Sequence, residues 1–313
     1  MDIKQRKHVL IMGAGAVGGY IGAKIFQNGA ADVTLVARGD HFKAIQKHGL
    51  MVSTSEDESA LPVPVVDRPE TITVPPDLII IAVKTKDTEQ AVSRIKPIIS
   101  PNTQVLTIQN GLGNYDYVSN ELGKEQVIRG FCRIGTEIVS PGHIHYSSMG
   151  DITIGEEDGS NSERCDMVQS IFTNAGIACE IADNILKRSW RKMIWNTVFN
   201  CLSGLTLTTL DAIYQTSQAH RLALDLAGEL QQIARADNVE FSDEEITRLI
   251  ENSARLGQFR TSTYQDRLKN KPLEYDAFCG YACRKAEQHG LQAPKLQTID
   301  ALFRLHDQQH PAQ

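Results

Sequence analysis

A glycine-rich turn near the start of the chain limits the fold more than any other feature. Gly13, Gly15 and Gly18 are spaced G-x-G-x-x-G, after an apolar run and before a helical pattern. The first glycine allows a tight turn, the second lets backbone approach a pyrophosphate, and the third lets helix and strand pack closely. Free N–H groups at the helix start favour an anion. The predicted dinucleotide contacts are Gly13, Ala14, Gly15, Ala16, Val17 and Gly18; the alternative is a turn that binds nothing.

Apolar runs and helical patterns alternate through the first half of the chain. The apolar runs lie at residues 9–12, 33–36, 78–83 and 105–108. The helical patterns between them include 16–28 and 87–95. Strands separated by helices predict a parallel sheet covered on both faces. Turn signals at Pro141-Gly142 and Asp158-Gly159 predict antiparallel strands between 130 and 155 that close one edge of this sheet.

From about Asn184 the strand signals end and long helical patterns follow. These patterns lie at residues 185–202, 219–238, 243–256 and 276–290. Ser242 and Glu245 have the spacing of a capping box, which predicts the start of the third helix. The fold class is therefore α/β, with an N-terminal Rossmann-type doubly wound sheet over 1–183 and a C-terminal all-helical domain over 184–313. A short junction predicts that the two domains share a cleft.

Composition excludes several classes of protein. Hydrophobic residues make up 41% and charged residues 22%, which is ordinary for a globular chain. A net charge of −6 argues against nucleic-acid binding. The polar segment 1–8 lacks a signal-peptide pattern, and the run 78–83 is too short to cross a bilayer. Six cysteines without a C-x-x-C pair favour reduced thiols. We expect a soluble cytoplasmic protein with no membrane or nucleic-acid partner and no metal, and the sequence leaves a homodimer open.

An arginine stands where NAD-binding folds usually carry an acidic residue. At the end of the second strand, about 20 residues after the glycine motif, Asp or Glu commonly binds the ribose 2′-hydroxyl. Here Arg38 occupies that place, followed by Gly39. A planar guanidinium suits a 2′-phosphate. The sequence therefore predicts NADP(H) rather than NAD(H), and the first domain is the predicted NADP-binding domain. The alternative is a solvated surface arginine.

Two further polar segments follow predicted strands. Lys84 ends the run 78–83, and Asn110-Gly111-Leu112-Gly113 follows the run 105–108. Open α/β sheets bind ligands at the carboxyl ends of their strands. Lys84 is therefore a predicted cofactor contact, and Asn110 a predicted cofactor or substrate contact. The alternatives are an exposed lysine and a simple Asn–Gly turn.

A polar stripe follows one face of an otherwise apolar helical pattern. Lys192, Asn196 and Asn200 are spaced i, i+4, i+8 and lie on one helix face. Their apolar neighbours are Met193, Ile194, Trp195, Val198 and Phe199. A helix that is apolar nearly all round is usually buried, and polar groups buried with it need partners. The pattern favours a stripe that lines a cleft; a solvated stripe is the alternative.

Such a stripe suits the reduction of a ketone. Hydride arriving at a carbonyl carbon leaves negative charge on the oxygen, which then needs a proton. A lysine ammonium stabilises that charge and donates the proton. The pKa of a lysine is about 10.4 in water, and partial desolvation lowers it. Lys192 is therefore the predicted proton donor of a helical substrate and catalytic domain.

In their order along the chain, these motifs resemble the ketopantoate reductases (2-dehydropantoate 2-reductases), which make D-pantoate for pantothenate and coenzyme A biosynthesis. The resemblance covers nearly the whole chain. It also rests on Trp190-Arg191-Lys192 and on two later segments, Ser262-Thr263-Tyr264-Gln265-Asp266 and Glu274-Tyr275-Asp276. These two are similar to the family's S-x-x-Q-D and E-x-D segments. The ordered set is far more specific than any one motif.

The resemblance implies a role for each matching residue. Lys192 is similar to the family's general acid, and Glu274 to the carboxylate that hydrogen-bonds the substrate hydroxyl and orients the lysine. The implied substrate contacts are Asn110, Asn196, Asn200 and Ser262. Asn110 also corresponds to a residue between cofactor and substrate. Without the resemblance, Glu274 is equally well explained as a helix-start residue with no function.

Some positions depart from the family pattern and leave the substrate pocket open. Cys201 follows Asn200 where the family often has proline, and Cys279 precedes Gly280 where it often has asparagine. The segment 130–134 is bulkier than the family's small residues, and Arg133 within it is either a carboxylate contact or an exposed side chain. Cys279 and Cys283 have a helical i, i+4 spacing that suits metal binding, but core cysteines explain them better.

Three hypotheses follow from the sequence. The first is an NADPH-dependent reductase of 2-dehydropantoate. The second is a related reductase that acts on another 2-oxo acid or on a 3-hydroxy acid. The third is an NADP(H) sensor without turnover, against which the complete set of Lys192, Asn196, Asn200 and Glu274 argues.

Overall fold

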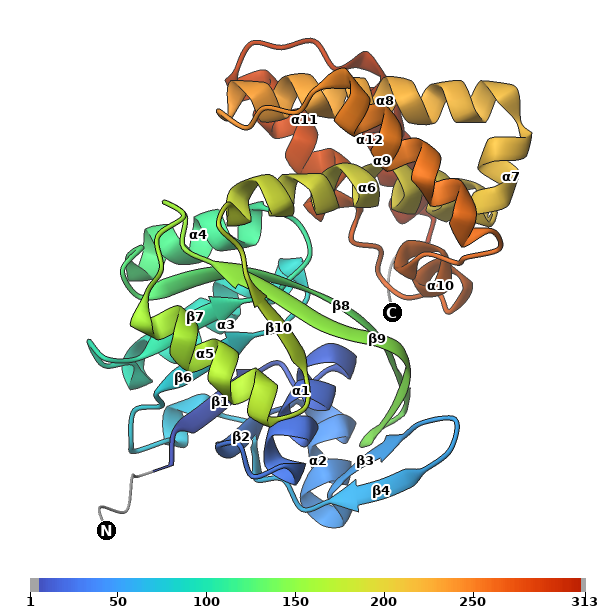
Figure 1. The fold of residues 1–313 in the computed structure, drawn as a ribbon. Helices are drawn as coiled ribbons and strands as arrows, with labels where there is room; N and C mark the ends of the chain where they lie inside the picture. The colour runs from blue at the N-terminus through green and yellow to red at the C-terminus, as the bar shows by residue number, and fades with distance from the viewer. Residues whose placement is uncertain (1–5, 311–313) are drawn as a thin grey trace. The chain divides into compact units, whose positions relative to one another are not determined.

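The computed structural model describes residues 6–310, apart from the side chain of Met149. The chain divides into two compact units, coloured blue to green and yellow to red in Figure 1. The first contains the described residues up to Asn110 and Asn114–Ile185; the second contains Gly111–Gly113 and the residues from Leu186 onward. The sequence predicts a division after Asp183, and the roles assigned to the two domains stay predictions. Residues 1–5, part of the polar N-terminal segment, lie outside the described residues.

The strands of the first unit form one mixed sheet. Within the described residues these are β1 His8–Met12, β2 Asp32–Val36, β3 Leu50–Ser53, β4 Glu58–Leu61, β5 Val65–Val66, β6 Leu78–Ile81, β7 Gln104–Thr107, β8 Val127–Ser140, β9 His143–Gly155 and β10 Ala178–Ile181. Their spatial order is β4-β3-β9-β8-β7-β6-β1-β2-β5, and β10 also pairs with β9.

The central part of this sheet is doubly wound. β5, β2, β1, β6, β7 and β8 are each parallel to their neighbours in this series. From β1 the chain moves outward to β2, forms β3 and β4 at the opposite edge, adds β5 beside β2, and then returns to β6 on the other side of β1. This reversal is the switch point at which open α/β sheets bind ligands, outside the carboxyl ends of the strands. The predicted fold class is confirmed.

Helices cover both faces of the sheet. They are α1 Ala16–Gln27, α2 Gly39–His48, α3 Thr88–Ile95, α4 Gly113–Leu122 and α5 Glu163–Asn174, with short 3-10 turns η1 Pro69–Thr71, η2 Thr85–Asp87 and η3 Lys96–Ile98. Val9 and Ile11 of β1 pack in one apolar cluster with side chains of α1, α2 and α5. Leu10 and Met12 pack in another with side chains of α3 and α4. Because successive side chains of a strand face opposite sides, burial on both faces produces a continuous apolar run.

The long β8–β9 hairpin differs from its prediction in one respect. It is antiparallel and turns at Pro141 and Gly142, as predicted. It does not close an edge, because β9 pairs on its other side with β3 near His143 and with β10 near Ile152. The 13 residues of β9 are long enough to pair with two short strands in succession. Those short strands carry no strong apolar alternation, so the sequence did not reveal them.

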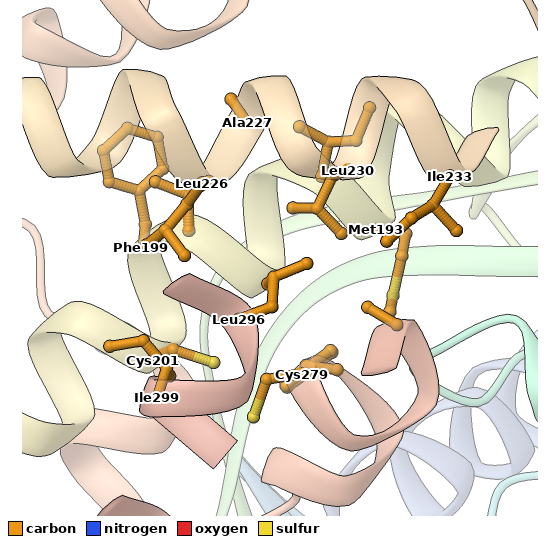
Figure 2. Close-up of a cluster of buried hydrophobic side chains, with 14 of the residues drawn as sticks. Met193, Phe199, Cys201, Leu226, Ala227, Leu230, Ile233, Cys279, Leu296 and Ile299 are labelled. Carbon is orange, nitrogen blue, oxygen red and sulfur yellow. The ribbon is translucent and has the colours of Figure 1, made fainter. Parts of the chain in front are cut away.

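The described residues from Leu186 onward form helices and no strand. The helices are α6 Ile185–Thr206, α7 Leu210–Gln215, α8 Ser217–Ala236, α9 Asp243–Glu251, α10 Ser262–Leu268, α11 Cys279–Gln288 and α12 Pro294–Gln309, with 3-10 turns η4 Asn252–Leu256 and η5 Tyr275–Ala277. Figure 2 shows part of their common core. Met193 and Phe199 of α6 lie there with Leu226 and Leu230 of α8 and Leu296 of α12.

Two predicted helices end or begin differently in the structure. The capping box at Ser242 and Glu245 is confirmed, with both reciprocal hydrogen bonds formed at 2.8 and 3.1 Å. The helix predicted over 243–256 changes to a 3-10 turn after Glu251. The helix predicted from 276 begins at Cys279, because Phe278 has φ −111° and ψ −95° and its ring is buried. Core packing thus overrides the helical pattern at Phe278.

Candidate functional site

The three motif glycines have three different surroundings. Gly13 has φ +103°, and a Cβ atom there would lie 2.7 Å from the Cγ1 atom of Val83. A Cβ atom on Gly18 would overlap the Gly13 carbonyl oxygen. Around Gly15 a Cβ atom would meet nothing within 4 Å. The first and third glycines therefore permit the turn and its packing, while the second faces open space, as a pyrophosphate contact requires.

The turn is held by neighbouring backbone. The Ala14 N–H donates to the carbonyl of Val36 at 2.8 Å, and the Ala82 N–H donates to the carbonyl of Met12 at 2.9 Å. Ala16 and Val17 begin α1, so the helix start directly follows Gly15, its N-cap residue. The predicted phosphate-binding residues thus form one strand–turn–helix unit at the carboxyl end of β1.

Arg38 lies at the next carboxyl end, after β2, as the N-cap residue of α2. Its side chain is 56% exposed. One guanidinium nitrogen donates to Gln90 Oε1 at 2.8 Å, and another lies 3.3 Å from Asp87 Oδ2. The predicted 2′-phosphate ligand is therefore paired with a carboxylate from the segment after β6. The sequence does not predict the pairing of Asp87 with Arg38, because nothing in the local pattern around Asp87 indicates a contact with a residue 49 positions away.

A hydrogen-bonded network joins the segments after β6 and β7. Gln109 Nε2 donates to the Val83 carbonyl at 3.0 Å and to Thr88 Oγ1 at 2.8 Å. Thr88 donates to Asn114 Oδ1, and Asn114 Nδ2 donates to the carbonyl of Asn110 at 2.7 Å. The network fixes the backbone of Asn110, which is partly buried, whereas Lys84 is exposed at the N-cap of η2.

One acceptor of this network is buried without a donor among the described residues. Gln109 is only 8% exposed, and among the described residues its Oε1 atom is buried without a hydrogen-bond partner. A buried acceptor without a donor costs about 1–3 kcal/mol. The open space at Gly15, beside the free N–H groups at the start of α1, fits a pyrophosphate at the carboxyl end of β1. The residues present therefore fit a bound dinucleotide.

In the second unit, α6 carries the polar stripe. Asn196 is 7% exposed and Asn200 2% exposed, while Lys192 is partly buried. Their helix neighbours Met193 and Val198 are buried in the core. A solvated stripe is therefore excluded for the two asparagines. Burying a side-chain amide costs free energy unless the amide forms hydrogen bonds, so two buried asparagines on an apolar helix indicate polar partners for their side chains.

The other predicted residues of the second unit lie at two short segments. Ser262 is exposed at the start of α10, next to Thr261, whose hydroxyl is 2.7 Å from Ser203 Oγ of α6. Glu274 is the N-cap of η5 and is partly buried. A Cβ atom on Gly111 would lie 2.6 Å from the Ala277 carbonyl oxygen of η5. The Gly111–Gly113 segment therefore packs against the segment that carries Glu274.

The remaining candidates have structural partners. Arg133 is exposed and forms a bidentate ion pair with Asp151 on the neighbouring strand. Cys279 and Cys201 are buried, and Cys283 is partly buried. The pKa of the Cys279 thiol is raised far above its usual range, first by the adjacent Cys201 thiol and then by burial. Among the described residues, no three His, Cys, Asp or Glu side chains form a group able to hold a metal ion.

The structure thus gathers the predicted residues into two sets. One occupies the carboxyl ends of β1, β2, β6 and β7, and the other lies on α6, α10 and η5. The predicted cleft shared by the two domains stays a prediction. No helix within residues 6–310 is both long and apolar enough to span a membrane.

A doubly wound sheet with a glycine turn at its switch point, followed by a helical unit, is an architecture typical of dinucleotide-binding proteins. Two family models match the chain: "Ketopantoate reductase PanE/ApbA" over residues 9–159 and "Ketopantoate reductase PanE/ApbA C terminal" over residues 184–307. The chain belongs to the ketopantoate reductase PanE/ApbA family. It is accordingly an oxidoreductase of that family.

Relatives match over almost their full length. A 2-dehydropantoate 2-reductase of a Nostoc species is 29% identical over 304 residues, which cover 95% of this chain and 94% of the relative. The crystal structure of a PanE/ApbA family ketopantoate reductase from Ralstonia eutropha has a TM-score of 0.88 at 29% identity, covering 97% and 99%. A D-mandelate dehydrogenase, solved with NADH and anilino(oxo)acetate, has a TM-score of 0.89 over 96% and 99%. Its identity is 24%, so it shows the fold alone.

Proposed function

We propose that this protein reduces 2-dehydropantoate to D-pantoate with NADPH, in pantothenate and coenzyme A biosynthesis. The observation that carries the proposal is the α6 stripe, where a partly buried lysine shares one helix face with two buried asparagines. The 2-dehydropantoate 2-reductase of the Nostoc species described above is 29% identical to this chain. A buried amide pair beside an amine suits a ligand with several oxygen atoms, such as a hydroxylated 2-oxo acid.

The first unit holds the cofactor in this proposal. Gly13 to Gly18 bind the pyrophosphate, Arg38 the 2′-phosphate, and Lys84 and Asn110 the segment nearer the nicotinamide. When bound, the nicotinamide supplies the hydride that reduces the ketone. The chain's own contribution there is to orient the dinucleotide through backbone N–H groups at the start of α1, which cost little reorganisation.

The second unit supplies the proton and the substrate contacts. The Lys192 ammonium hydrogen-bonds the ketone oxygen, stabilises the negative charge that develops on it, and donates a proton to it. Glu274 accepts a hydrogen bond from the substrate hydroxyl and orients Lys192. Asn196, Asn200 and Ser262 donate to or accept from the remaining oxygens. Asn110 belongs to the substrate contacts as well as to the cofactor site.

The charge of Arg38 favours NADPH over NADH, but a neighbouring carboxylate opposes that preference. Its guanidinium suits a phosphate dianion, but Asp87 already pairs with it at 3.3 Å. A carboxylate near the ribose is also what NAD-binding folds use for the 2′-hydroxyl. The structurally similar D-mandelate dehydrogenase was solved with NADH. We therefore propose a preference for NADPH that Asp87 moderates.

A second candidate is the reduction of another 2-oxo acid. It is favoured by the D-mandelate dehydrogenase, whose structure contains anilino(oxo)acetate on the same fold. A panel of 2-oxo acids, followed by NADPH absorbance, separates the two. The proposal predicts the highest kcat/KM with 2-dehydropantoate; a higher value with an aromatic 2-oxo acid selects the second candidate. If the protein binds NADPH but no 2-oxo acid of the panel causes its oxidation, the hypothesis of an NADP(H) sensor without turnover is favoured. Six free thiols favour a cytoplasmic protein, and a homodimer stays a prediction.

A further inference from the structure

His41 connects two backbone segments that lie far apart in the sequence. It belongs to the first turn of α2 and is partly buried. Its Nε2 atom is 2.8 Å from the carbonyl oxygen of Ala14, in the glycine-rich turn. Its Nδ1 atom accepts a hydrogen bond of 2.9 Å from the N–H of Gly142, in the turn between β8 and β9.

Gly142 is itself held on three sides. Its carbonyl accepts from the Met51 N–H at 2.8 Å. It has φ +77°, and a Cβ atom there would lie 2.8 Å from the Cβ atom of Ala44 on α2. The β8–β9 turn is therefore held in place by its neighbours, and its hydrogen bond to Nδ1 fixes the orientation of the His41 ring. A side chain at position 142 would both strain the backbone and displace α2.

These two bonds determine the protonation state of the ring. An N–H group of the backbone can only donate, so Nδ1 must carry a lone pair. A carbonyl oxygen can only accept, so Nε2 must carry the hydrogen. His41 is consequently neutral with its hydrogen on Nε2. Burial lowers the pKa of His41, and the bond to Ala14 partly opposes that effect.

The bond to Ala14 also fixes the next N–H group along the chain. The peptide unit is planar and trans, so the N–H of Gly15 points away from the direction of the Ala14 carbonyl. With the carbonyl turned toward His41, the Gly15 N–H is turned away from His41. Gly15 is the N-cap of α1 and is the glycine with open space around it. That N–H is the kind of donor that binds phosphate at a helix start.

We propose that His41 is a positioning residue of the dinucleotide site, which holds the Ala14–Gly15 peptide in the orientation that binds the cofactor pyrophosphate. The inference rests on the proposed function only in that the glycine turn binds a dinucleotide. His41 itself is not proposed to contact the cofactor. It acts through the peptide plane, with the β8–β9 turn as its support.

Two substitutions separate the two bonds of the ring. The amide nitrogen of glutamine can take the place of Nε2, so His41→Gln keeps a donor for Ala14 and loses the bond to Gly142. The amide oxygen of asparagine can take the place of Nδ1, so His41→Asn keeps the acceptor for Gly142 and loses the bond to Ala14. The two variants are matched in polarity and charge.

The experiment measures NADPH dissociation constants, kinetic constants and melting temperatures for the wild type and both variants. We expect His41→Asn to raise the Kd and KM for NADPH about tenfold, as loss of one hydrogen bond would, with kcat and the substrate KM changed less than twofold. His41→Gln should bind NADPH within about twofold of the wild type although its melting temperature also falls. If the two variants lose affinity equally, or in proportion to their melting temperatures, His41 is merely structural and the proposal is wrong.

Two further results keep the proposal testable. If His41→Asn does not fold, nitrogen NMR of the wild-type ring reports the tautomer directly, and a hydrogen on Nδ1 at neutral pH would overturn the proposal. If the wild type binds neither NADPH nor NADH, the proposed function fails and this inference with it. Normal wild-type binding with unaltered binding by His41→Asn overturns this inference alone.

Discussion

The two sets of candidate residues use different parts of the chain for their chemistry. At the carboxyl end of β1 the glycine turn offers backbone groups, and the lack of a side chain at Gly15 leaves open space beside them. On α6 the stripe offers side chains, and the backbone groups are used within the helix itself. A backbone site depends on conformation and open space, whereas a side-chain site depends on residue identity. The two sets should therefore respond to different substitutions.

The largest effect is expected at the side-chain site. Lys192→Ala removes the proposed proton donor and should lower kcat about 1000-fold, since general acid catalysis contributes about 10²- to 10⁴-fold. NADPH binding, measured by fluorescence titration, should change less than twofold because the lysine serves the substrate. Asn196→Ala serves as a control on the same helix face and should raise the substrate KM instead. Turnover near the wild-type rate in Lys192→Ala would refute the assigned role.

At the backbone site, the two glycines Gly18 and Gly15 give a matched pair. Gly18→Ala would force a Cβ atom into the Gly13 carbonyl and should lower the free energy of unfolding by about 3 kcal/mol. Gly15→Ala has room and a φ of −70°, so its stability should stay within about 0.5 kcal/mol of the wild type.

Cofactor affinity distinguishes the same pair further. Gly15→Ala should still weaken NADPH binding, because its methyl group fills the space that the pyrophosphate needs. Denaturant unfolding and NADPH titration together check both substitutions. Unchanged affinity in Gly15→Ala would show that the open space at this glycine is not the phosphate site.

The cofactor preference should shift in opposite directions at one ion pair. Arg38→Asp should remove the preference for NADPH over NADH, lowering the ratio of their kcat/KM values about tenfold or more. Asp87→Asn should raise that ratio severalfold, because it frees the guanidinium from its carboxylate. Glu89→Gln is the control, because it also removes one negative charge and Glu89 is a nearby exposed residue. An unchanged ratio in Arg38→Asp would exclude the 2′-phosphate assignment.

A smaller effect should appear in the pH dependence of stability. Burial holds the pKa of His41 below that of an unfolded histidine, so the folded state binds fewer protons. The stability that its neutral ring contributes is present above about pH 6.5 and is lost as the pH falls through the lowered pKa. Urea unfolding from pH 7.5 to 5 should show this loss in the wild type and a shallower one in His41→Gln.

Nearby charged groups should not mask that effect. Arg38 pairs with Asp87, Asp40 with Lys43, and His143 hydrogen-bonds Ser53 and lies 3.8 Å from Glu58. Burial also lowers the pKa values of His8 and His306, so both residues contribute to the slope of the wild-type unfolding free energy against pH. The difference between wild type and His41→Gln isolates His41, and parallel slopes would contradict the prediction.

The sequence alone was sufficient for the features set by local spacing. The glycine turn, the alternation of strands and helices in the first half and the α6 stripe follow from periods of two and 3.6 residues and from one conformational rule for glycine. The capping box at Ser242 also follows, because its two hydrogen bonds join residues three positions apart. Family resemblance added Ser262 and Glu274, whose local patterns carry little information.

The tertiary structure decided every contact between distant segments. The pairing of Arg38 with Asp87, the bridge from His41 to Ala14 and Gly142, and the addition of β3 and β10 to β9 all join residues from separate elements. Such contacts leave no periodic trace, because a hydrogen bond depends on where two groups meet in space and not on their distance along the chain. A single sequence therefore specifies the elements and their buried faces, while the partners of polar side chains are determined only when those elements pack.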